Sequence, residues 1–276
     1  MGTSLTESER FCFALSPCNP PHQIFGGNRP NQIYHVAVMP CYDKKLEASR
    51  EDFYNDVYRT RDVDCVITTG ELEKIFEEKG QQIATTAEAP LDTLFSKVHS
   101  QNGEEVLLGT AGGGSGGYLE AIFRYAAMEL FGVELQAIEY KVGKNQDFKE
   151  TSLEVDGKVV LRFATAYGFR NIQNFVRKVK TKNVPYHFVE VMACPSGCLN
   201  GGGQIKAEPA HAKEFLAQVE QAYESVTQAP PEKNTKVHEL YEEWLGAPSS
   251  AKAKEKLHTK YHAIEKTLAN PLSVQW

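Results

Sequence analysis

Three cysteines stand in loops rich in proline and glycine, and each one follows a short apolar run. Cys41 comes directly after Met39-Pro40, whereas Cys194 and Cys198 belong to a segment that ends in three consecutive glycines. Thiolates hold iron–sulfur clusters, which also need backbone N–H donors to their sulfides. Glycine allows the backbone to approach a bound group closely. The pattern therefore favours an iron–sulfur cluster over a disulfide or a packed core.

Each of these cysteines also has an ordinary structural interpretation. Cys194 and Cys198 are four residues apart, but Pro195 and Gly197 indicate a loop rather than one face of a helix. Two buried structural thiols are the alternative, because a Cys-x3-Cys spacing is less specific than paired Cys-x2-Cys motifs. Cys41 taken alone is equally consistent with a small buried residue.

Lys44 and Glu47 add charge beside Cys41. A lysine near a thiolate cluster offsets its negative charge, and the acid would then pair with that lysine or hold the loop. The alternative is an exposed helix start that carries an ordinary charge pair, which contributes at most about 1 kcal/mol.

Other candidate sites are weaker. Gly112–Gly117 precedes a predicted helix, where a loop can bind phosphate. The segment lacks the spacing of dinucleotide-binding and Walker loops, so a close-packed turn or a loop that contacts the cluster is favoured. Cys65, in the middle of a predicted strand, is interpreted as a core residue. His258 and His262 have the i,i+4 spacing of metal ligands on a helix, but no third ligand is evident.

The two ends of the chain hold further candidates. Cys12 and Cys18 lie in an irregular segment rich in turn signals, and their ordinary interpretation is a pair of exposed thiols. Trp276 is the last residue of the sequence. It is interpreted either as part of a frayed tail or as a short motif whose ring and carboxylate dock on a partner.

Composition limits the class of protein. The 276 residues are 41% hydrophobic, enough for a substantial core, and the net charge of −6 gives no electrostatic case for nucleic acid. The basic run at 177–182 is interpreted as the polar face and end of a helix. No apolar run reaches the ~18 residues of a membrane span. The first residues lack a signal-peptide plan, which favours an intracellular, reducing compartment.

Hydrophobic periodicity predicts alternating strands and helices, and so an α/β fold. One α/β domain is expected over residues 31–264, after an irregular start (1–30) and before a tail (265–276). An Asp156-Gly157 turn is expected to join two strands as a hairpin. Strands are expected at 33–39, 62–68, 133–140, 151–155, 158–164 and 186–192. Helices are expected at 68–79, near 91–98, and at 118–131, 169–180, 209–227, 235–245 and 249–263.

Two motifs resemble the second and third signatures of iron-only hydrogenases. They are Met39-Pro40-Cys41-x-x-Lys44-x-x-Glu47 and Glu190-x-Met192-Ala193-Cys194-x-x-x-Cys198-x-x-Gly201-Gly202-Gly203-Gln204. The segment 63–72 is similar to the strand-to-helix segment of the same domain. The resemblance implies an α/β domain like the C-terminal domain of the hydrogenase large subunit, with two lobes around a cluster site. It also implies that Cys41, Cys194 and Cys198 are ligands of a [4Fe–4S] cluster.

Within this family the chain resembles the eukaryotic hydrogenase-like branch of cytosolic iron–sulfur assembly factors, with prelamin A recognition factors as near relatives. Tyr167-Gly168-Phe169-Arg170 and Pro185-Tyr186-His187-Phe188 fit that branch. The resemblance implies delivery of clusters to cytosolic and nuclear proteins, with upstream scaffold and late targeting-complex proteins as partners. No nucleic acid or membrane partner is implied. The expected location is the cytoplasm, with the nucleus in addition, and Trp276 is the expected docking residue.

The chain departs from the family in its first part. The Cys-Pro-Gly-Trp motif and the ferredoxin-like region that precede Met39 in the family are absent. The first lobe is therefore expected to be incomplete, with unpaired edges on the strand at 33–39, and hydrogenase activity is not expected. Cys12 or Cys18 is the candidate for a fourth cluster ligand. A nuclear protein that binds a prenylated lamin tail is the alternative function, and a true hydrogenase is a third.

Overall fold

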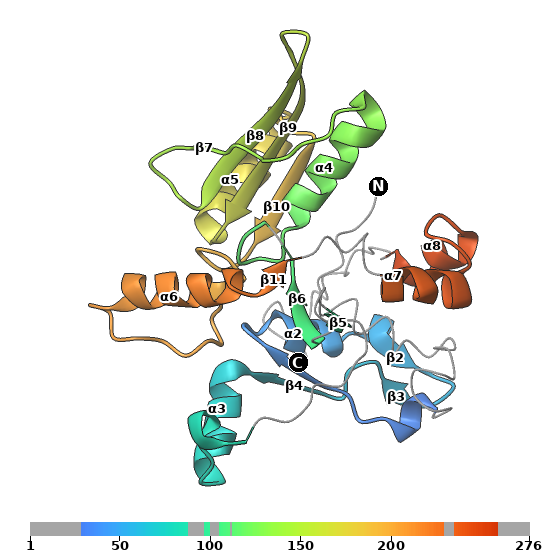
Figure 1. Ribbon diagram of the computed structural model, residues 1–276, viewed down its shortest axis with the longest axis vertical. Coiled ribbons are helices and arrows are strands. Elements are labelled where there is room, and N and C mark those ends of the chain that lie inside the picture. The colour runs from blue at the N-terminus through green and yellow to red at the C-terminus, as the bar shows by residue number, and fades with distance from the viewer. Residues whose placement is uncertain (1–28, 88–96, 100–104, 111, 229–234, 259–276) are drawn as a thin grey trace, which may run out of the picture. The chain divides into compact units, whose positions relative to one another are not determined.

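The computed structural model describes residues 29–87, 97–99, 105–110, 112–228 and 235–258. The chain forms two compact units. Unit 1 combines the residues up to Thr68 with those from Thr235 onward, and unit 2 runs from Thr69 to Asn234. Figure 1 shows the elements of both units, and strands alternate with helices as predicted. The predictions for Cys12, Cys18, His262 and Trp276 lie outside the described residues.

Unit 1 is built on a short parallel pair of strands. β1 (Val36–Met39) lies beside β4 (Cys65–Thr68), with Val36 opposite Cys65 and Met39 opposite Thr68. Each strand begins three residues later than the apolar runs suggest. β1 is therefore not without a sheet neighbour, although its described sheet has only two strands. The remaining elements here are η1 (Pro30–Gln32), α2 (Asp43–Ala48), η2 (Glu51–Phe53), β2 (Tyr54–Asn55) and β3 (Thr60–Arg61).

The C-terminal helices of unit 1 share a small core of their own. α7 (Thr235–Leu240) continues into a π-helical turn, η6 (Tyr241–Leu245), and α8 (Ala251–Leu257) follows. Trp244, Leu245 and Ala253 are buried together. The Ser250 side chain caps α8 by accepting the Ala253 N–H at 2.9 Å.

The largest sheet of unit 2 has the order β10-β9-β8-β7. The predicted hairpin is confirmed, because Asp156 (φ 52°) and Gly157 (φ 74°) form its turn in the left-handed region. β10 runs parallel to β9 and is reached through α5, the crossover that such a pair requires. The elements are β7 (Lys141–Val142), β8 (Phe148–Val155), β9 (Lys158–Tyr167), α5 (Phe169–Lys180) and β10 (Phe188–Met192).

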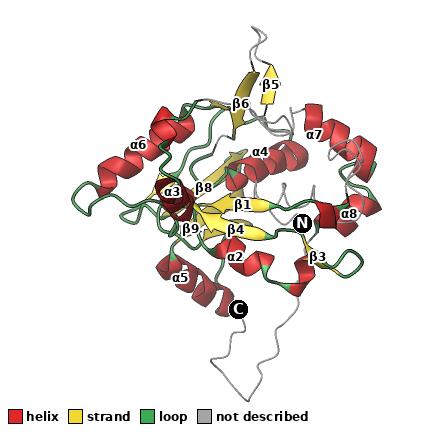
Figure 2. Cartoon of the chain, turned by 90° about the horizontal axis from the view of Figure 1, so that it is seen from below, coloured by secondary structure: helices red, strands yellow, loops and turns green. Residues whose placement is uncertain are grey.

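Helix α4 (Tyr118–Phe131) supplies one half of the main core of unit 2. Its buried residues Leu119, Phe123 and Ala127 are spaced four apart and pack on β8 and β9. The Phe123 and Phe163 rings meet edge to face, with centroids 4.9 Å apart. Figure 2 shows α4 and α5 on opposite sides of the strands, so the sheet is covered on both faces.

The strand predicted over 133–140 is wrong. Helix α4 ends at Gly132 in the left-handed conformation (φ 67°), with the Val133 N–H donating to the Ala127 carbonyl at 3.1 Å. The following residues form no regular element. Their apolar side chains still pack against the core around α4, which explains an alternating pattern without a strand.

The second described sheet of unit 2 was not predicted. β6 (Glu105–Gly109) pairs antiparallel with β5 (Lys97–His99) and parallel with β11 (Thr227–Gln228). A loop with a helix near 91–98 was predicted here, and residues 97 and 98 lie in a strand instead. Thr227 belongs to β11, so the helix predicted over 209–227 is shorter. The other elements are α3 (Thr69–Glu78), η3 (Ile83–Thr85), η4 (Cys198–Asn200) and α6 (Ala212–Glu224). No described helix is long and apolar enough to cross a membrane.

Candidate functional site

Cys194 and Cys198 lie in one loop of unit 2, between β10 and α6, as the sequence predicts. The loop turns at Ser196 (φ 61°) and Gly197 (φ 83°), both in the left-handed region. The Gly197 N–H donates to the Cys194 carbonyl at 3.2 Å, and η4 begins at Cys198. Both cysteines are reduced thiols and half-buried. Two soft metal ligands therefore lie four residues apart in one short connection.

The Gly112–Gly117 segment packs against this loop. The Cys198 N–H donates to the hydroxyl oxygen of Ser115 at 3.2 Å, and Ser115 is buried. A Cβ on Gly197 would lie 2.3 Å from that hydroxyl oxygen, and one on Gly114 would lie 2.5 Å from Leu199 Cδ1. The prediction of a close-packed turn is confirmed, because a glycine of each segment lies against a side chain of the other where a Cβ would collide.

A chain of buried hydrogen bonds continues from Ser115. The Tyr167 hydroxyl is hydrogen-bonded to Ser115 and donates to the Glu190 carboxylate. Glu190 also accepts the Leu119 N–H at 2.7 Å. Burial raises the pKa of Glu190. Burial and the neighbouring Glu190 carboxylate both raise the pKa of Tyr167. The Cys198 peptide is thus connected to β9, β10 and the first turn of α4.

Glu190 belongs to one of the two sequence motifs, but its role in this hydrogen-bond chain was not predicted from the sequence. A single acid inside the apolar strand β10 was the available signal, because a buried carboxylate needs partners.

A second anchor holds the exposed turn of the loop. The Ser196 N–H donates to the Asp147 carboxylate at 2.6 Å. Next to it, the Asn145 side-chain amide donates to Asn171, whose own amide donates to the Tyr167 carbonyl. These residues come from the β7–β8 connection and from α5. Nothing in their spacing along the sequence indicates this contact.

The glycine run after Cys198 is anchored to the start of α3. The Gly203 carbonyl accepts the Gly70 N–H at 3.0 Å and the Thr69 hydroxyl at 3.1 Å. The Thr69 hydroxyl also hydrogen-bonds the Gln204 side chain. A Cβ on Gly70 would lie 3.3 Å from the same carbonyl, so the two segments are in close backbone contact.

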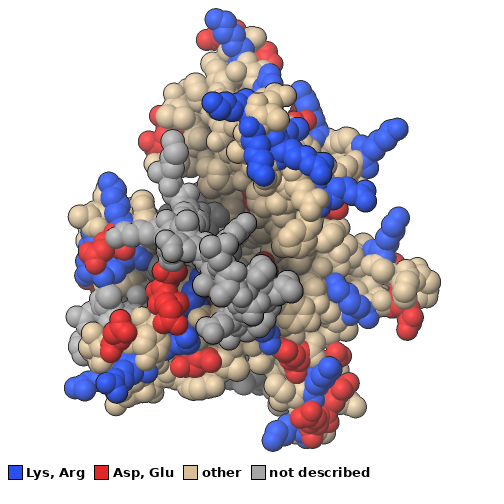
Figure 3. Space-filling model, turned by 180° about the vertical axis from the view of Figure 1, so that it is seen from behind, with Lys and Arg blue, Asp and Glu red and all other residues tan. Residues whose placement is uncertain are grey.

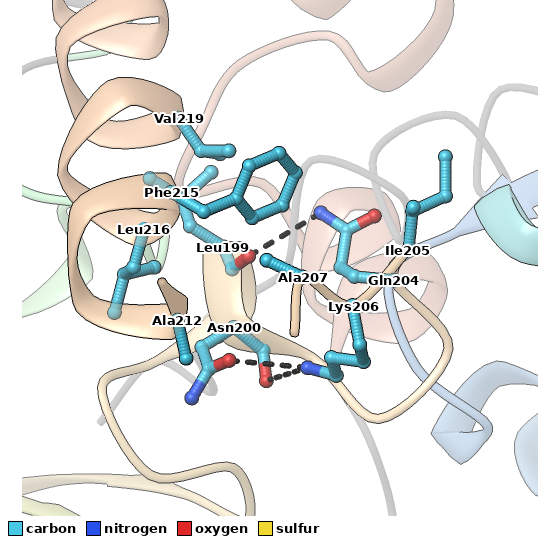
Figure 4. A pocket seen from close by; sticks show the side chains of 10 residues that line it. All are labelled: Leu199, Asn200, Gln204, Ile205, Lys206, Ala207, Ala212, Phe215, Leu216 and Val219. Atoms are coloured by element: carbon cyan, nitrogen blue, oxygen red, sulfur yellow. Dashed lines mark hydrogen bonds between the residues drawn. The ribbon is translucent and has the colours of Figure 1, made fainter. Parts of the chain in front are cut away.

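A small pocket opens beside η4 and α6 (Figure 4). Lys206 holds its rim by donating to the carbonyls of Asn200 (3.2 Å) and Gly201 (2.9 Å). The apolar wall comes from α6. The pocket is lined by Leu199, Asn200, Gln204, Ile205, Lys206, Ala207, Ala212, Phe215, Leu216 and Val219.

Cys41 belongs to unit 1, in the turn between β1 and α2, and is half-buried. Three residues further along the chain, the Lys44 side chain is 4% exposed and donates to the Glu47 carboxylate at 2.6 Å. The alternative of an exposed charge pair at a helix start is therefore wrong. Lys44 also faces Asp62, where burial raises the pKa to about 7 and the lysine charge opposes the rise. Cys65 is half-buried at the first position of β4, so its prediction as a core residue is wrong.

The side chains that the candidate loop offers as metal ligands are the thiols of Cys194 and Cys198, which are soft donors. Within either unit, no described group of three or more His, Cys, Asp or Glu side chains could hold a metal ion. Cys194 and Cys198 share unit 2, and Cys41 belongs to unit 1. A loop with two half-buried thiols and a close backbone wrap fits the requirements of an iron–sulfur cluster better than those of Ca²⁺ or Mg²⁺.

Comparison with known proteins identifies the family to which this fold belongs. The C-terminal domain of the iron-only hydrogenase large subunit matches residues 7–202, and the iron hydrogenase small subunit matches residues 213–264. The chain belongs to the iron-only hydrogenase family. The first match covers all three motif cysteines and begins upstream of the residues that carry the motif resemblance. The second covers most of α6 and all of α7, η6 and α8.

Relatives of high identity carry assembly-factor names. The chain is 57% identical to a cytosolic Fe-S cluster assembly factor narfl of Xenopus tropicalis, across 95% of this chain and 56% of the relative. It is 54% identical to cytosolic iron-sulfur assembly component 3 of Mus musculus, again across 95% and 56%. A nuclear prelamin A recognition factor of Xenopus laevis is 46% identical across 90% and 53%. The chain thus spans about half the length of these relatives.

Solved hydrogenase structures share the fold. A variant of the [FeFe]-hydrogenase HydA1 from Chlamydomonas reinhardtii aligns with a TM-score of 0.72 at 29% identity, covering 94% of this chain and 70% of that one. A structure titled for stepwise [FeFe]-hydrogenase H-cluster assembly aligns with a TM-score of 0.71 at 30% identity. The predicted hydrogenase-like α/β fold is confirmed.

Proposed function

We propose that this chain holds a [4Fe–4S] cluster through Cys41, Cys194 and Cys198 and works in the assembly of cytosolic iron–sulfur proteins. The bound cluster would supply a site for storing or passing on iron and sulfide. The protein's own part is to hold the thiolates at fixed positions and to limit their contact with water. Hydrogen evolution is not expected, because the relatives of high identity are named as assembly factors and not as hydrogenases.

The observation that carries this proposal is the hydrogen-bonded loop around Cys194 and Cys198. Ser115, Asp147 and Gly70 attach it to three separate segments of unit 2. A loop that only closed a strand-to-helix connection would not need a buried hydroxyl under one cysteine peptide. Preorganised ligands lower the entropy lost on metal binding. The names of the relatives support the assembly role over a catalytic one.

The direct test is the iron and acid-labile sulfide content of the anaerobically reconstituted chain. We expect about four irons per chain, as a [4Fe–4S] cluster requires, and loss of most iron in Cys194→Ala and in Cys41→Ala. Cys65→Ala is the matched control, because Cys65 is also a reduced, half-buried thiol and lies outside the two signature motifs. No iron in soluble, folded protein would exclude the proposal for this chain.

Partners and location follow from the same proposal. The chain would receive clusters from an upstream scaffold and pass them to a late targeting complex in the cytoplasm, with the nucleus as a further location. Trp276 would dock on the partner. Removal of Trp276 should then reduce co-purification of targeting-complex proteins without changing the iron content. Equal loss of both would point to unfolding instead.

A second candidate function is recognition of a prenylated lamin tail. One relative at 46% identity is named a nuclear prelamin A recognition factor, which favours this alternative. A farnesylated lamin-tail peptide should then bind the chain, and the unmodified peptide should not. Equal binding by the iron-free protein would show that this function needs no cluster.

A further inference from the structure

Positive charge is concentrated in one stretch of an otherwise acidic chain. Residues 157–189 hold seven Lys and Arg and no Asp or Glu. The rest of the chain then has 23 basic and 36 acidic residues, a net charge of −13. This stretch contains β9, α5 and the start of β10. Figure 3 shows Lys and Arg side chains gathered over the part of unit 2 that holds the four-stranded sheet.

Helix α5 presents part of this charge as a stripe. Successive helical residues are about 100° apart, so Arg170, Arg177 and Lys180 fall within about 80° of one another. All three are exposed. They lie on the side away from Asn171, the buried residue of the helix, whose amide reaches the Tyr167 carbonyl at the end of β9.

Apolar side chains border the cationic stripe. Phe169 is 69% exposed and Val176 is 43% exposed. The two are seven residues apart, so they lie on the same side of α5, within about 40° of Lys180. The aromatic ring and the valine, neighbours on this side of α5, form a mixed surface with the three cations.

The charges of the stripe are not neutralised by the described parts of the chain. Arg170, Arg177 and Lys180 form no ion pair there, in contrast to Arg124 with Glu120 on α4. Lys178 has a different role, because its ammonium group lies over the Phe148 and Tyr186 rings at 5.5 and 5.6 Å. That lysine therefore belongs to the packing of α5, and the other three are available to a partner.

We propose that the face of α5 formed by Arg170, Arg177 and Lys180 with Phe169 and Val176 docks an acidic protein segment that carries apolar side chains. Carboxylates would pair with the two guanidinium groups, which bind them in a bidentate manner. Leucine-type side chains would cover the ring and the valine. The proposal does not depend on the iron–sulfur cluster.

The mixed character of the face favours protein over nucleic acid or a membrane surface. A phosphate backbone would gain from the three cations and would leave Val176 uncovered. The net charge of −13 elsewhere on the chain would repel a long polyanion or an anionic vesicle more than a short acidic segment.

The test is fluorescence anisotropy with the full chain and a short labelled peptide, mostly Glu with two Leu. We expect saturable binding that weakens between about 50 and about 300 mM salt, and at least about tenfold weaker binding by R170Q/R177Q/K180Q. A peptide with Ser in place of Leu should bind several-fold more weakly. The control variant K74Q/K79Q/K213Q removes three exposed lysine charges elsewhere in unit 2: one in α3, one just after α3 and one in α6. It should bind the peptide like the wild type.

Two further arms keep the proposal open to contradiction. R170K/R177K/K180R retains the three charges but exchanges both guanidinium groups, so it should bind more weakly than the wild type and more tightly than R170Q/R177Q/K180Q. An oligonucleotide and an anionic vesicle serve as competing probes. Stronger binding of either, no saturable binding of the peptide, or equal binding by the neutral variant would each overturn the proposal.

Discussion

At the scale of single residues, the contact between Gly197 and Ser115 controls the cysteine loop. Gly197→Ala would place a Cβ 2.3 Å from the Ser115 hydroxyl oxygen and would force an alanine to φ 83°. We expect the variant to lose most of its reconstituted iron, because the Cys198 peptide must move. Iron and sulfide content and amide exchange of residues 194–204 would measure the effect.

Gly113→Ala separates backbone strain from collision. Gly113 has a similar positive φ of 88°, but a Cβ there would meet nothing within 4 Å. Its variant should keep most of the iron and lose about 1 kcal/mol of stability. Adding Ser115→Gly to Gly197→Ala should restore part of the iron. Equal iron loss in the two alanine variants would show that the collision is irrelevant.

Asp62 gives a pH-dependent prediction for unit 1. Burial raises the pKa of its folded-state carboxyl from 3.8 to about 7. The folded form therefore binds the proton more tightly. Its stabilisation is complete below about pH 4 and is lost as the pH rises toward 7. After allowance for solvent screening, we expect the free energy of unfolding to fall by about 1–2 kcal/mol over this pH range.

Amide-exchange protection of β4 at pH 5 and pH 7.5, corrected for intrinsic exchange rates, would show this loss. Asp62→Asn should remove the difference, because it cannot ionise. Asp64→Asn is the neighbouring control, since Asp64 is exposed. A wild-type protein equally protected at both pH values would contradict the assignment.

The sequence alone supplied the cysteines of the candidate site, because their motifs combine rare residue types in a fixed order. It could not supply the residues that hold them. Ser115 is 83 positions from Cys198, and Asp147 is 49 from Ser196. Such contacts depend on how strands and helices pack, which no local pattern encodes.

At the scale of elements, the π-helical turn η6 contains an unusual buried group. The indole N–H of Trp244 has no hydrogen-bond partner among the described residues, although Trp244 is only 5% exposed. An unsatisfied buried donor costs about 1–3 kcal/mol. Trp244→Phe removes the donor and keeps most of the ring, so we expect stability close to or above that of the wild type.

Trp244→Ala removes the ring itself and should destabilise this helical cluster by about 3–5 kcal/mol. Amide exchange of α8 would measure both variants. Destabilisation of the phenylalanine variant by as much as the alanine variant would mean that the indole N–H has a partner in solution.

Helices and strands were predictable where a clear hydrophobic periodicity is bounded by turn-forming residues. Helix α4 was predicted over its observed range because four-residue spacing leads to Gly132, and the β8–β9 hairpin because Asp156-Gly157 suits its turn. A strand was wrongly predicted over residues 133–140, because their alternation of apolar and polar side chains reflects packing against the core rather than strand pairing. β6 was missed because its apolar run is short and its parallel partner, β11, lies far away in the chain.

At the scale of the whole molecule, the proposed ligands are divided between two compact units. Cys41 belongs to unit 1, and Cys194 and Cys198 belong to unit 2. The chain spans about half the length of its relatives. Its first sheet, β1 with β4, leaves Val36 and Val38 over 40% exposed. A ligand bound by Cys41 would stabilise this two-stranded sheet.

A single cluster bound by all three thiolates would couple the stability of the two units. Reconstitution should then slow amide exchange in β1 and β4 and in residues 194–204 together, by about tenfold or more, because a ligand stabilises every segment that must be ordered to bind it. Cys41→Ala should abolish the protection in both places. If it removed protection only from unit 1, the cysteines would bind iron separately and the shared cluster would be excluded. Cys65→Ala, which removes a thiol outside the motifs, should leave both segments protected.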